Sequence, residues 1–168
     1  FLYNRDKDKL VKFLIKTKIK KFKVLNRGEI LNLKNIDLLV NTTSIGFDSW
    51  IKKKNIFYNL MFFTPFLNLK NIAGLKIIDK KKFIAKNRKL IEKDKNIYLK
   101  FLEQNPKCSI FDIIYNPKYT KLIKLAKNEG HITKNGLDMN LYQAVKAFCI
   151  VNNNKEYLVK KIMTKKNG

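Results

Sequence analysis

At 168 residues, 45% of them hydrophobic, the chain is long enough for one ordinary domain with a core of its own. Its formal net charge of +24 comes almost wholly from lysine, because only Arg5, Arg27 and Arg88 among the 37 basic residues are arginine. AT-rich codons specify lysine, asparagine and isoleucine, and base recognition favours the guanidinium group, so the composition indicates codon bias and disfavours a nucleic-acid partner.

The N-terminal part of the chain alternates between strand-like and helical patterns. Leu10, Val11, Leu14 and Ile15 have the spacing of one helix face. The elements expected here are a strand over 1–3, a helix over 6–18, a strand over 22–25, a helix or turn over 28–33, and a buried strand over 37–41. The last strand ends in a cluster of small polar residues followed by Gly46.

The segment 48–104 is ambiguous. It contains a strand candidate over 75–78, a lysine-rich helix over 80–103, and six aromatic residues: Trp50, Phe57, Tyr58, Phe62, Phe63 and Phe66. These aromatic side chains either cover one face of a sheet or belong to a lineage-specific insertion, and we assign the segment as such an insertion, without a function.

Regular alternation returns after this segment. An apolar strand over 109–115 is closed by Pro117, which cannot continue a central strand. The elements expected after it are a helix over 119–128 with Gly130 at its end, a strand over 131–133, and helices over 138–151 and 155–164. Strands that alternate with helices through short connections predict an α/β fold with a parallel sheet.

Four segments together resemble the shikimate dehydrogenase family. They are Asn4-Arg5 with Lys9 one helical turn later, similar to N-R-T-x-x-R; 41–46, similar to N-[AT]-T-S-x-G; 111–117 with the helix over 120–130, similar to D-x-x-Y-x-P and T-x-L-L-x-x-A-x-x-x-G; and 136–144, similar to G-L-G-M-L-x-x-Q-A. The resemblance covers residues 1–47 and 109–164. It implies a single domain with a partial Rossmann-like, doubly wound parallel sheet and C-terminal helices that pack back on the cleft.

The resemblance implies reduction of 3-dehydroshikimate to shikimate with NADP as cofactor. Asn4 stands where many NAD enzymes carry an acid for the ribose hydroxyls, so a 2′-phosphate meets no repulsion there. Arg5 and Lys9 are then able to pair with that phosphate. Asp6 departs from the family's usual threonine and opposes this preference, so use of NAD stays open.

The remaining site residues are also carried over from the family. Beside the cofactor it implies Thr42, Thr43, Ser44, Ile113, Gly136 and Met139. For the substrate it implies Tyr115, the last residue of its predicted strand, and Gln143, which shares a helix face with Met139. Asp138 replaces the commoner glycine of the fourth motif, which puts the detail of that turn in doubt.

Two parts of a working enzyme are missing from the sequence. The family's glycine-rich pyrophosphate turn should precede Phe1, and its catalytic lysine–aspartate pair belongs to an N-terminal substrate domain. No catalytic residue is therefore assigned, and the start at Phe1 is read as that of a fragment. His131 is expected to have a packing or surface role, and Cys108 and Cys149 to be core residues.

The expected partner is a small-molecule substrate, without a metal or a membrane, since no apolar run reaches the about 18 residues of a span. The cytoplasm or a plastid-like organelle is the expected location. Two alternatives stay open: a basic organellar or ribosome-associated RNA-binding protein, and a pseudoenzyme that keeps the fold for partner binding. A basic stripe on one folded face would favour the RNA-binding alternative.

Overall fold

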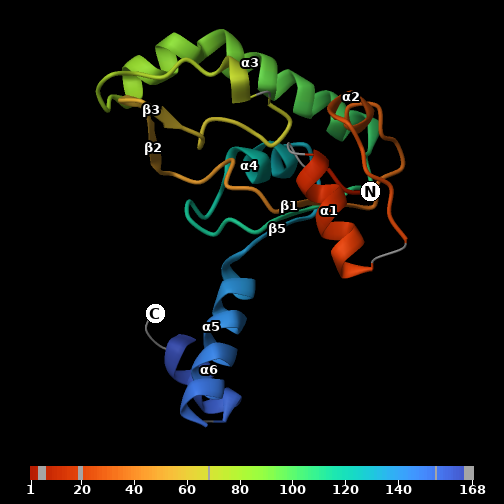
Figure 1. The fold of residues 1–168 in the computed structure, drawn as a ribbon, viewed down its shortest axis with the longest axis vertical. Coiled ribbons are helices and arrows are strands. Elements are labelled where there is room, and N and C mark those ends of the chain that lie inside the picture. The colour runs from red at the N-terminus through yellow and green to blue at the C-terminus, as the bar shows by residue number, and fades with distance from the viewer. Residues whose placement is uncertain (4–6, 19–20, 68, 154, 165–168) are drawn as a thin grey trace.

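A parallel sheet of three strands forms the centre of the molecule (Figure 1). The computed structural model describes residues 1–3, 7–18, 21–67, 69–153 and 155–164. β1 (Leu38–Asn41), β4 (Ser109–Asp112) and β5 (Thr133–Asn135) lie in the order β1-β4-β5, and both neighbouring pairs are parallel. The predicted α/β class is therefore confirmed. The register aligns the last residues of the strands, Asn41, Asp112 and Asn135, at one edge.

The N-terminal elements lie beside this sheet. Leu2 pairs in parallel with Val24, through backbone hydrogen bonds of 2.8 and 2.9 Å to the neighbours of Val24. In the described residues, the strands expected over 1–3 and 22–25 are thus reduced to one bridge, and neither pairs with β1. The helices of this part are α1 (Lys7–Thr17) and α2 (Arg27–Ile30), close to their predicted positions.

The segment 48–104 consists of a hairpin, a short turn of 3-10 helix and a long helix. Their bounds are β2 (Trp50–Lys53), β3 (Ile56–Asn59), η1 (Leu69–Asn71) and α3 (Lys80–Gln104). Lys54 and Asn55 both have positive φ, as the tight turn of a hairpin requires. The prediction of a strand over 75–78 is wrong. Leu75 makes only an isolated bridge, and Ile77 and Ile78 after it are exposed.

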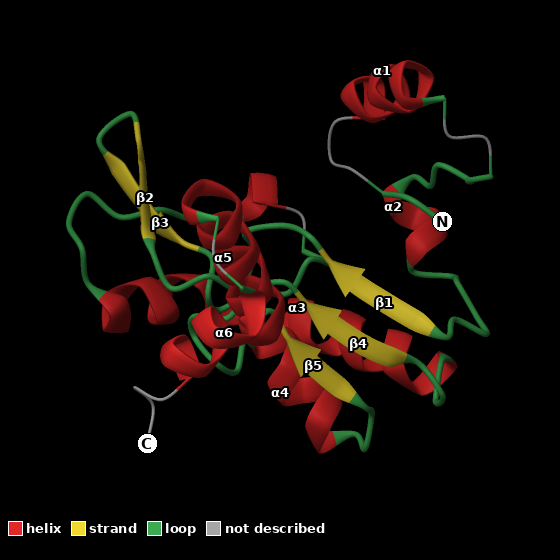
Figure 2. Ribbon diagram, turned by 90° about the horizontal axis from the view of Figure 1, so that it is seen from below, coloured by secondary structure: helices red, strands yellow, loops and turns green. Residues whose placement is uncertain are grey.

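One face of the sheet is covered by α3 and by α4 (Lys121–Asn128) (Figure 2). The core between them contains Tyr98, Phe101 and Leu102 of α3 together with Ile110, Leu122, Ile123, Ala126 and Cys108. Phe66 packs into the same core, 4.9 Å from the ring centre of Phe101. A second core forms within 45–83 around Phe63 and Phe83. Among the six aromatic residues of the segment, Phe66 therefore packs in the core that covers the sheet face, whereas Phe63 packs in the second core.

β4 ends earlier than predicted and β5 begins later than predicted, and both differences have local causes. β4 ends at Asp112 because the Asp112 carboxylate accepts the Ile114 backbone N–H at 3.1 Å, and such a turn competes with the sheet ladder. β5 begins only at Thr133, because the residues before it still close α4. Gly130 has a φ of +81°, and the His131 backbone N–H donates to Ala126 O at 3.0 Å.

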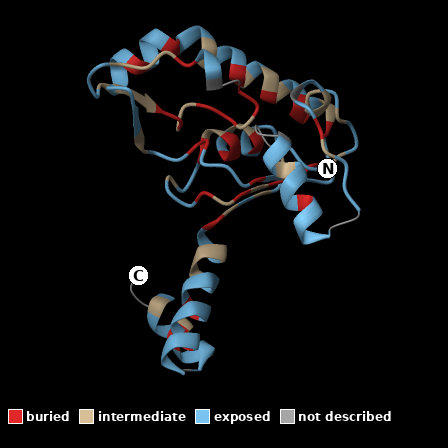
Figure 3. Ribbon diagram, viewed as in Figure 1, coloured by how far each residue is buried: buried red, intermediate tan, exposed pale blue. Residues whose placement is uncertain are grey.

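The chain ends in α5 (Leu137–Asn152) and α6 (Glu156–Thr164), which pack on each other. We expected these helices to pack back on the cleft. In the structure the start of α5 adjoins the carboxyl edge of the sheet, and the pair then projects away from it (Figure 1). Most of their surface is exposed (Figure 3). Cys108 and Cys149 are free and buried, as expected of core residues.

Candidate functional site

The carboxyl ends of β1 and β4 are joined by buried polar side chains. Asp112 is fully buried and accepts hydrogen bonds from Asn41 Nδ2 at 3.0 Å and from Thr120 Oγ1 at 2.6 Å. Burial raises the pKa of the Asp112 carboxyl, and the hydrogen bonds from Thr120, Ile114 and Asn41 oppose that rise. Thr120 also caps α4, so the same network fixes where that helix begins.

Asn41 shapes the polar loop that follows β1. Its Oδ1 accepts the Thr43 backbone N–H at 2.9 Å and the Thr43 hydroxyl at 2.7 Å, while its Nδ2 donates to Ile45 O at 3.2 Å. Ile45 is buried in the second core, and Gly46, at a φ of +113°, donates its N–H to Leu60 O. The loop is thereby held from both sides, and Thr42, Thr43 and Ser44 are left exposed.

A cleft of about 360 Å³ lies at this edge of the sheet. Its lining consists of Thr42, Thr43, Ser44, Phe47, Ile113, Ile114 and Tyr115. Five of these residues are among those predicted from the sequence for the cofactor and the substrate. Tyr115 follows β4, lines the cleft and is 45% exposed. The prediction that Tyr115 and Asn41 share one edge is correct, although Tyr115 lies beyond its strand.

Gly136 lies against Ile113 and Ile114 of the cleft, although it does not line the cleft itself. Its N–H donates to Ile114 O at 3.2 Å, and a Cβ at this position would lie 1.8 Å from Ile113 O. Only glycine therefore permits the approach between the start of α5 and the segment after β4. Asn135, which the sequence reading missed, supports this turn by donating to Lys118 O and accepting the Leu137 N–H.

Other predicted site residues do not line the cleft. Met139 is half-buried in the first turn of α5, and Gln143 is exposed one turn further. Lys9 is exposed on α1, whereas Asn4 and Arg5 lie outside the described residues. Asp138, at the position of the family's glycine, is exposed and pairs with Lys134. Tyr115 and Gly136 are thus brought together, and Met139 and Gln143 are not.

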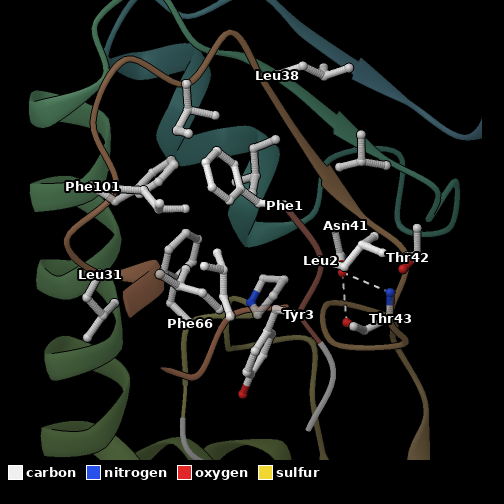
Figure 4. A pocket seen from close by; sticks show the side chains of 17 residues that line it. Phe1, Leu2, Tyr3, Leu31, Leu38, Asn41, Thr42, Thr43, Phe66 and Phe101 are labelled. Carbon is white, nitrogen blue, oxygen red and sulfur yellow. Dashed lines mark hydrogen bonds between the residues drawn. The ribbon is translucent and has the colours of Figure 1, made fainter. Parts of the chain in front are cut away.

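A second cavity, of about 370 Å³ and mainly apolar, lies between residues 1–3 and β1 (Figure 4). Leu31, Phe66 and Phe101 line it on one side in that view, and Thr42 and Thr43 line both hollows. Ser44 and Tyr115 line only the cleft at the carboxyl edge of the sheet, where ligands of parallel α/β sheets bind, so that cleft is the candidate site.

The described residues contain no cluster of three or more histidine, cysteine, aspartate or glutamate side chains that is arranged to hold a metal ion. In the same part of the chain, no helix is both long enough and apolar enough to cross a bilayer. His131 lies half-buried with Nδ1 2.8 Å from Cys108 O, which is a packing position.

Comparison with known proteins agrees with the resemblance in the motifs, although no family model matches the chain. The NADP(+) shikimate dehydrogenase of Pelagibacter ubique is 36% identical over 137 residues, which cover 82% of this chain and 42% of that protein. That of Dictyoglomus turgidum is 63% identical over 35 residues, which cover 21% of this chain and 13% of that protein. The chain spans less than half the length of these relatives.

Solved structures show the same fold. A chorismate mutase/shikimate 5-dehydrogenase fusion protein from Clostridium acetobutylicum matches with a TM-score of 0.56 at 21% identity, over 98% of this chain and 44% of that one. Shikimate 5-dehydrogenase from Listeria monocytogenes, in complex with shikimate and NAD, matches with a TM-score of 0.50 at 18% identity, over 96% of this chain and 45% of that one. With these relatives and this fold, the chain belongs to the shikimate dehydrogenase family.

Proposed function

We propose that the chain is the cofactor-binding part of an NADP-dependent shikimate dehydrogenase, which interconverts 3-dehydroshikimate and shikimate. The observation that carries the proposal is the cleft at the carboxyl edge, which Thr42, Ser44 and Tyr115 line together. Ligands of parallel α/β sheets bind at that edge. The curated relatives are named as NADP(+) enzymes, and the Listeria structure holds shikimate and NAD.

In this proposal one group of residues at the cleft binds the cofactor, and another binds the substrate. The loop 42–44, Ile113 and Gly136 lie along the cofactor, with Met139 beyond them, and the nicotinamide exchanges a hydride with the substrate carbon. Asn4, Arg5 and Lys9 receive the 2′-phosphate. Tyr115 and Gln143 hydrogen-bond the substrate, and the phenol does so from a position that is already exposed to the cleft.

We further propose that the chain works within a longer polypeptide, called here the full-length protein, which adds a substrate domain and one strand to the sheet. In dinucleotide-binding sheets the first strand lies between the second and the fourth. Here residues 1–3 and β1 would be those flanking strands, and the apolar cavity lies between them. Phe1, Leu38 and Val40 along this gap are 68%, 55% and 43% exposed, which is unusual for apolar strand residues.

Tyr115→Phe in the full-length protein tests the proposed function. Loss of one hydrogen bond to a charged substrate group costs about 1.5–3 kcal/mol, so kcat/KM for shikimate should fall by roughly 10- to 100-fold. The KM for NADP should stay within about twofold of the wild-type value, because the phenol does not contact the cofactor in this proposal. Steady-state kinetics with each substrate varied in turn provide the measurement.

Tyr119→Phe is the matched control, since Tyr119 is 43% exposed but does not line the cleft. This variant should keep wild-type kinetics. If Tyr115→Phe also kept them, or if it lost NADP binding while shikimate binding was normal, the proposed role of the cleft would be wrong.

A further inference from the structure

Asp112 is placed unusually for a carboxylate in the core of a sheet. It is fully buried at the end of β4, and its hydrogen-bond partners among the described residues are neutral: Thr120 Oγ1, Asn41 Nδ2 and the Ile114 backbone N–H. Burying a carboxylate without a cation is costly. The three hydrogen bonds that the Asp112 carboxylate accepts offset part of this cost.

Two of the three partners of Asp112, Asn41 and Ile114, connect it to segments that line the cleft. Asn41 orders the loop 42–46, called here the cofactor loop because of its proposed role, through its bonds to Thr43 and Ile45. The Ile114 N–H fixes the turn that leads into Tyr115, and the Ile114 carbonyl accepts the Gly136 N–H at 3.2 Å. One carboxylate therefore connects the cofactor loop, the substrate tyrosine and the start of α5.

We propose that Asp112 is a positioning residue that holds the cofactor loop 42–46 in register with Tyr115 and Gly136, and so sets the alignment of nicotinamide and substrate. This inference rests on the proposed function. Hydride transfer needs near-attack geometry, and a displacement on the order of 1 Å lowers turnover by about 100-fold. Ground-state binding of either ligand changes less, because each ligand contacts mainly one wall.

The test compares Asp112→Asn with Asp94→Asn in the full-length protein. Asp94 is equally buried and accepts the Thr64 backbone N–H at 2.9 Å and the Thr64 hydroxyl at 2.8 Å, but it lies on α3, outside the cleft. It also pairs with Lys121 at 3.4 Å, so Asp94→Asn should lower Tm at least as much as Asp112→Asn does. Turnover is measured well below both Tm values and normalised to the folded fraction from circular dichroism.

For Asp112→Asn, kcat should fall by roughly 10- to 100-fold, while the KM values for shikimate and NADP change by less than about threefold. Asp94→Asn should keep kcat within about twofold of wild type.

Wild-type kcat in folded Asp112→Asn, or a higher KM at unchanged kcat, would overturn the inference and leave the proposed function standing. If Asp112→Asn does not fold, Thr120→Val replaces it, since it removes one bond to the carboxylate. A severalfold loss of kcat is then expected, and unchanged kcat would refute the role. A full-length wild type that does not oxidise shikimate would overturn the proposed function and this inference together.

Discussion

The 168-residue chain alone should form no NADPH from shikimate and NADP, whereas the full-length protein should form it readily. Hydride transfer requires both ligands in near-attack geometry and a group that takes the hydroxyl proton. In the proposed function, the cleft supplies one wall of such a site. By resemblance, the lysine–aspartate pair and the pyrophosphate turn belong to the remainder of the enzyme. The absorbance of NADPH in matched assays of the two proteins gives the result.

Turnover by the chain alone, dependent on both shikimate and NADP, would contradict this expectation. It would mean that one of the many lysines of this chain serves as the proton acceptor. The wild-type full-length protein is the positive control, and its Tyr115→Phe variant distinguishes turnover in the cleft from a background reaction.

Gly136→Ala should cause the largest loss among single substitutions at or next to the cleft. The added Cβ would lie 1.8 Å from Ile113 O and 2.4 Å from Ile113 C, and both are backbone atoms that no side-chain rotation can move. Either α5 or the segment that carries Tyr115 must shift. We expect a loss of about 3 kcal/mol or more in unfolding free energy, at or beyond the usual range for overpacking. Activity should be abolished as well.

Gly130→Ala is the matched control for this variant. Gly130 has a φ of +81° but no atom within 4 Å of an added Cβ, so only backbone strain of about 1–2 kcal/mol is introduced. Denaturant unfolding and shikimate oxidation should therefore separate the two variants clearly. Equal losses of stability, with activity kept in both, would show that the start of α5 tolerates displacement from Ile113.

The parts of the fold with strong local signals were predictable from the sequence. The helix over 80–103 was predicted within one residue of α3, and the polar cluster after 37–41 marked the loop that follows β1. The cleft residues were found because small polar side chains and a tyrosine follow two neighbouring strands, whose carboxyl ends must share an edge. Their roles remain predictions, and they came from the family resemblance.

The features that could not be predicted from the sequence depend on tertiary contacts. The hairpin of β2 and β3 carries no glycine turn, and the strand proposed over 75–78 lacks a partner beyond Leu75. Asp112 was passed over because it was read as part of an apolar strand. A carboxylate in the middle of such a run is itself a signal, since it has to be satisfied by partners that sequence spacing does not reveal.

The segment 48–104 has a structural role that bears on the cleft. Ile45 of the loop 42–46 packs with Leu60, Phe63 and Phe83 in the second core. Gly46 is also bonded to Leu60 O. The segment therefore supports the loop from behind, while Asp112 and Asn41 hold it from the sheet side.

Amide hydrogen exchange of the full-length protein, with and without saturating NADP, tests most directly whether this cleft is the cofactor site. Bound cofactor should slow exchange in the loop 42–46 and in the segment 113–115, since both line the cleft. Exchange at the projecting ends of α5 and α6 serves as the internal reference. Protection confined to other parts of the chain, with 42–46 and 113–115 unchanged, would contradict the assignment of the cleft.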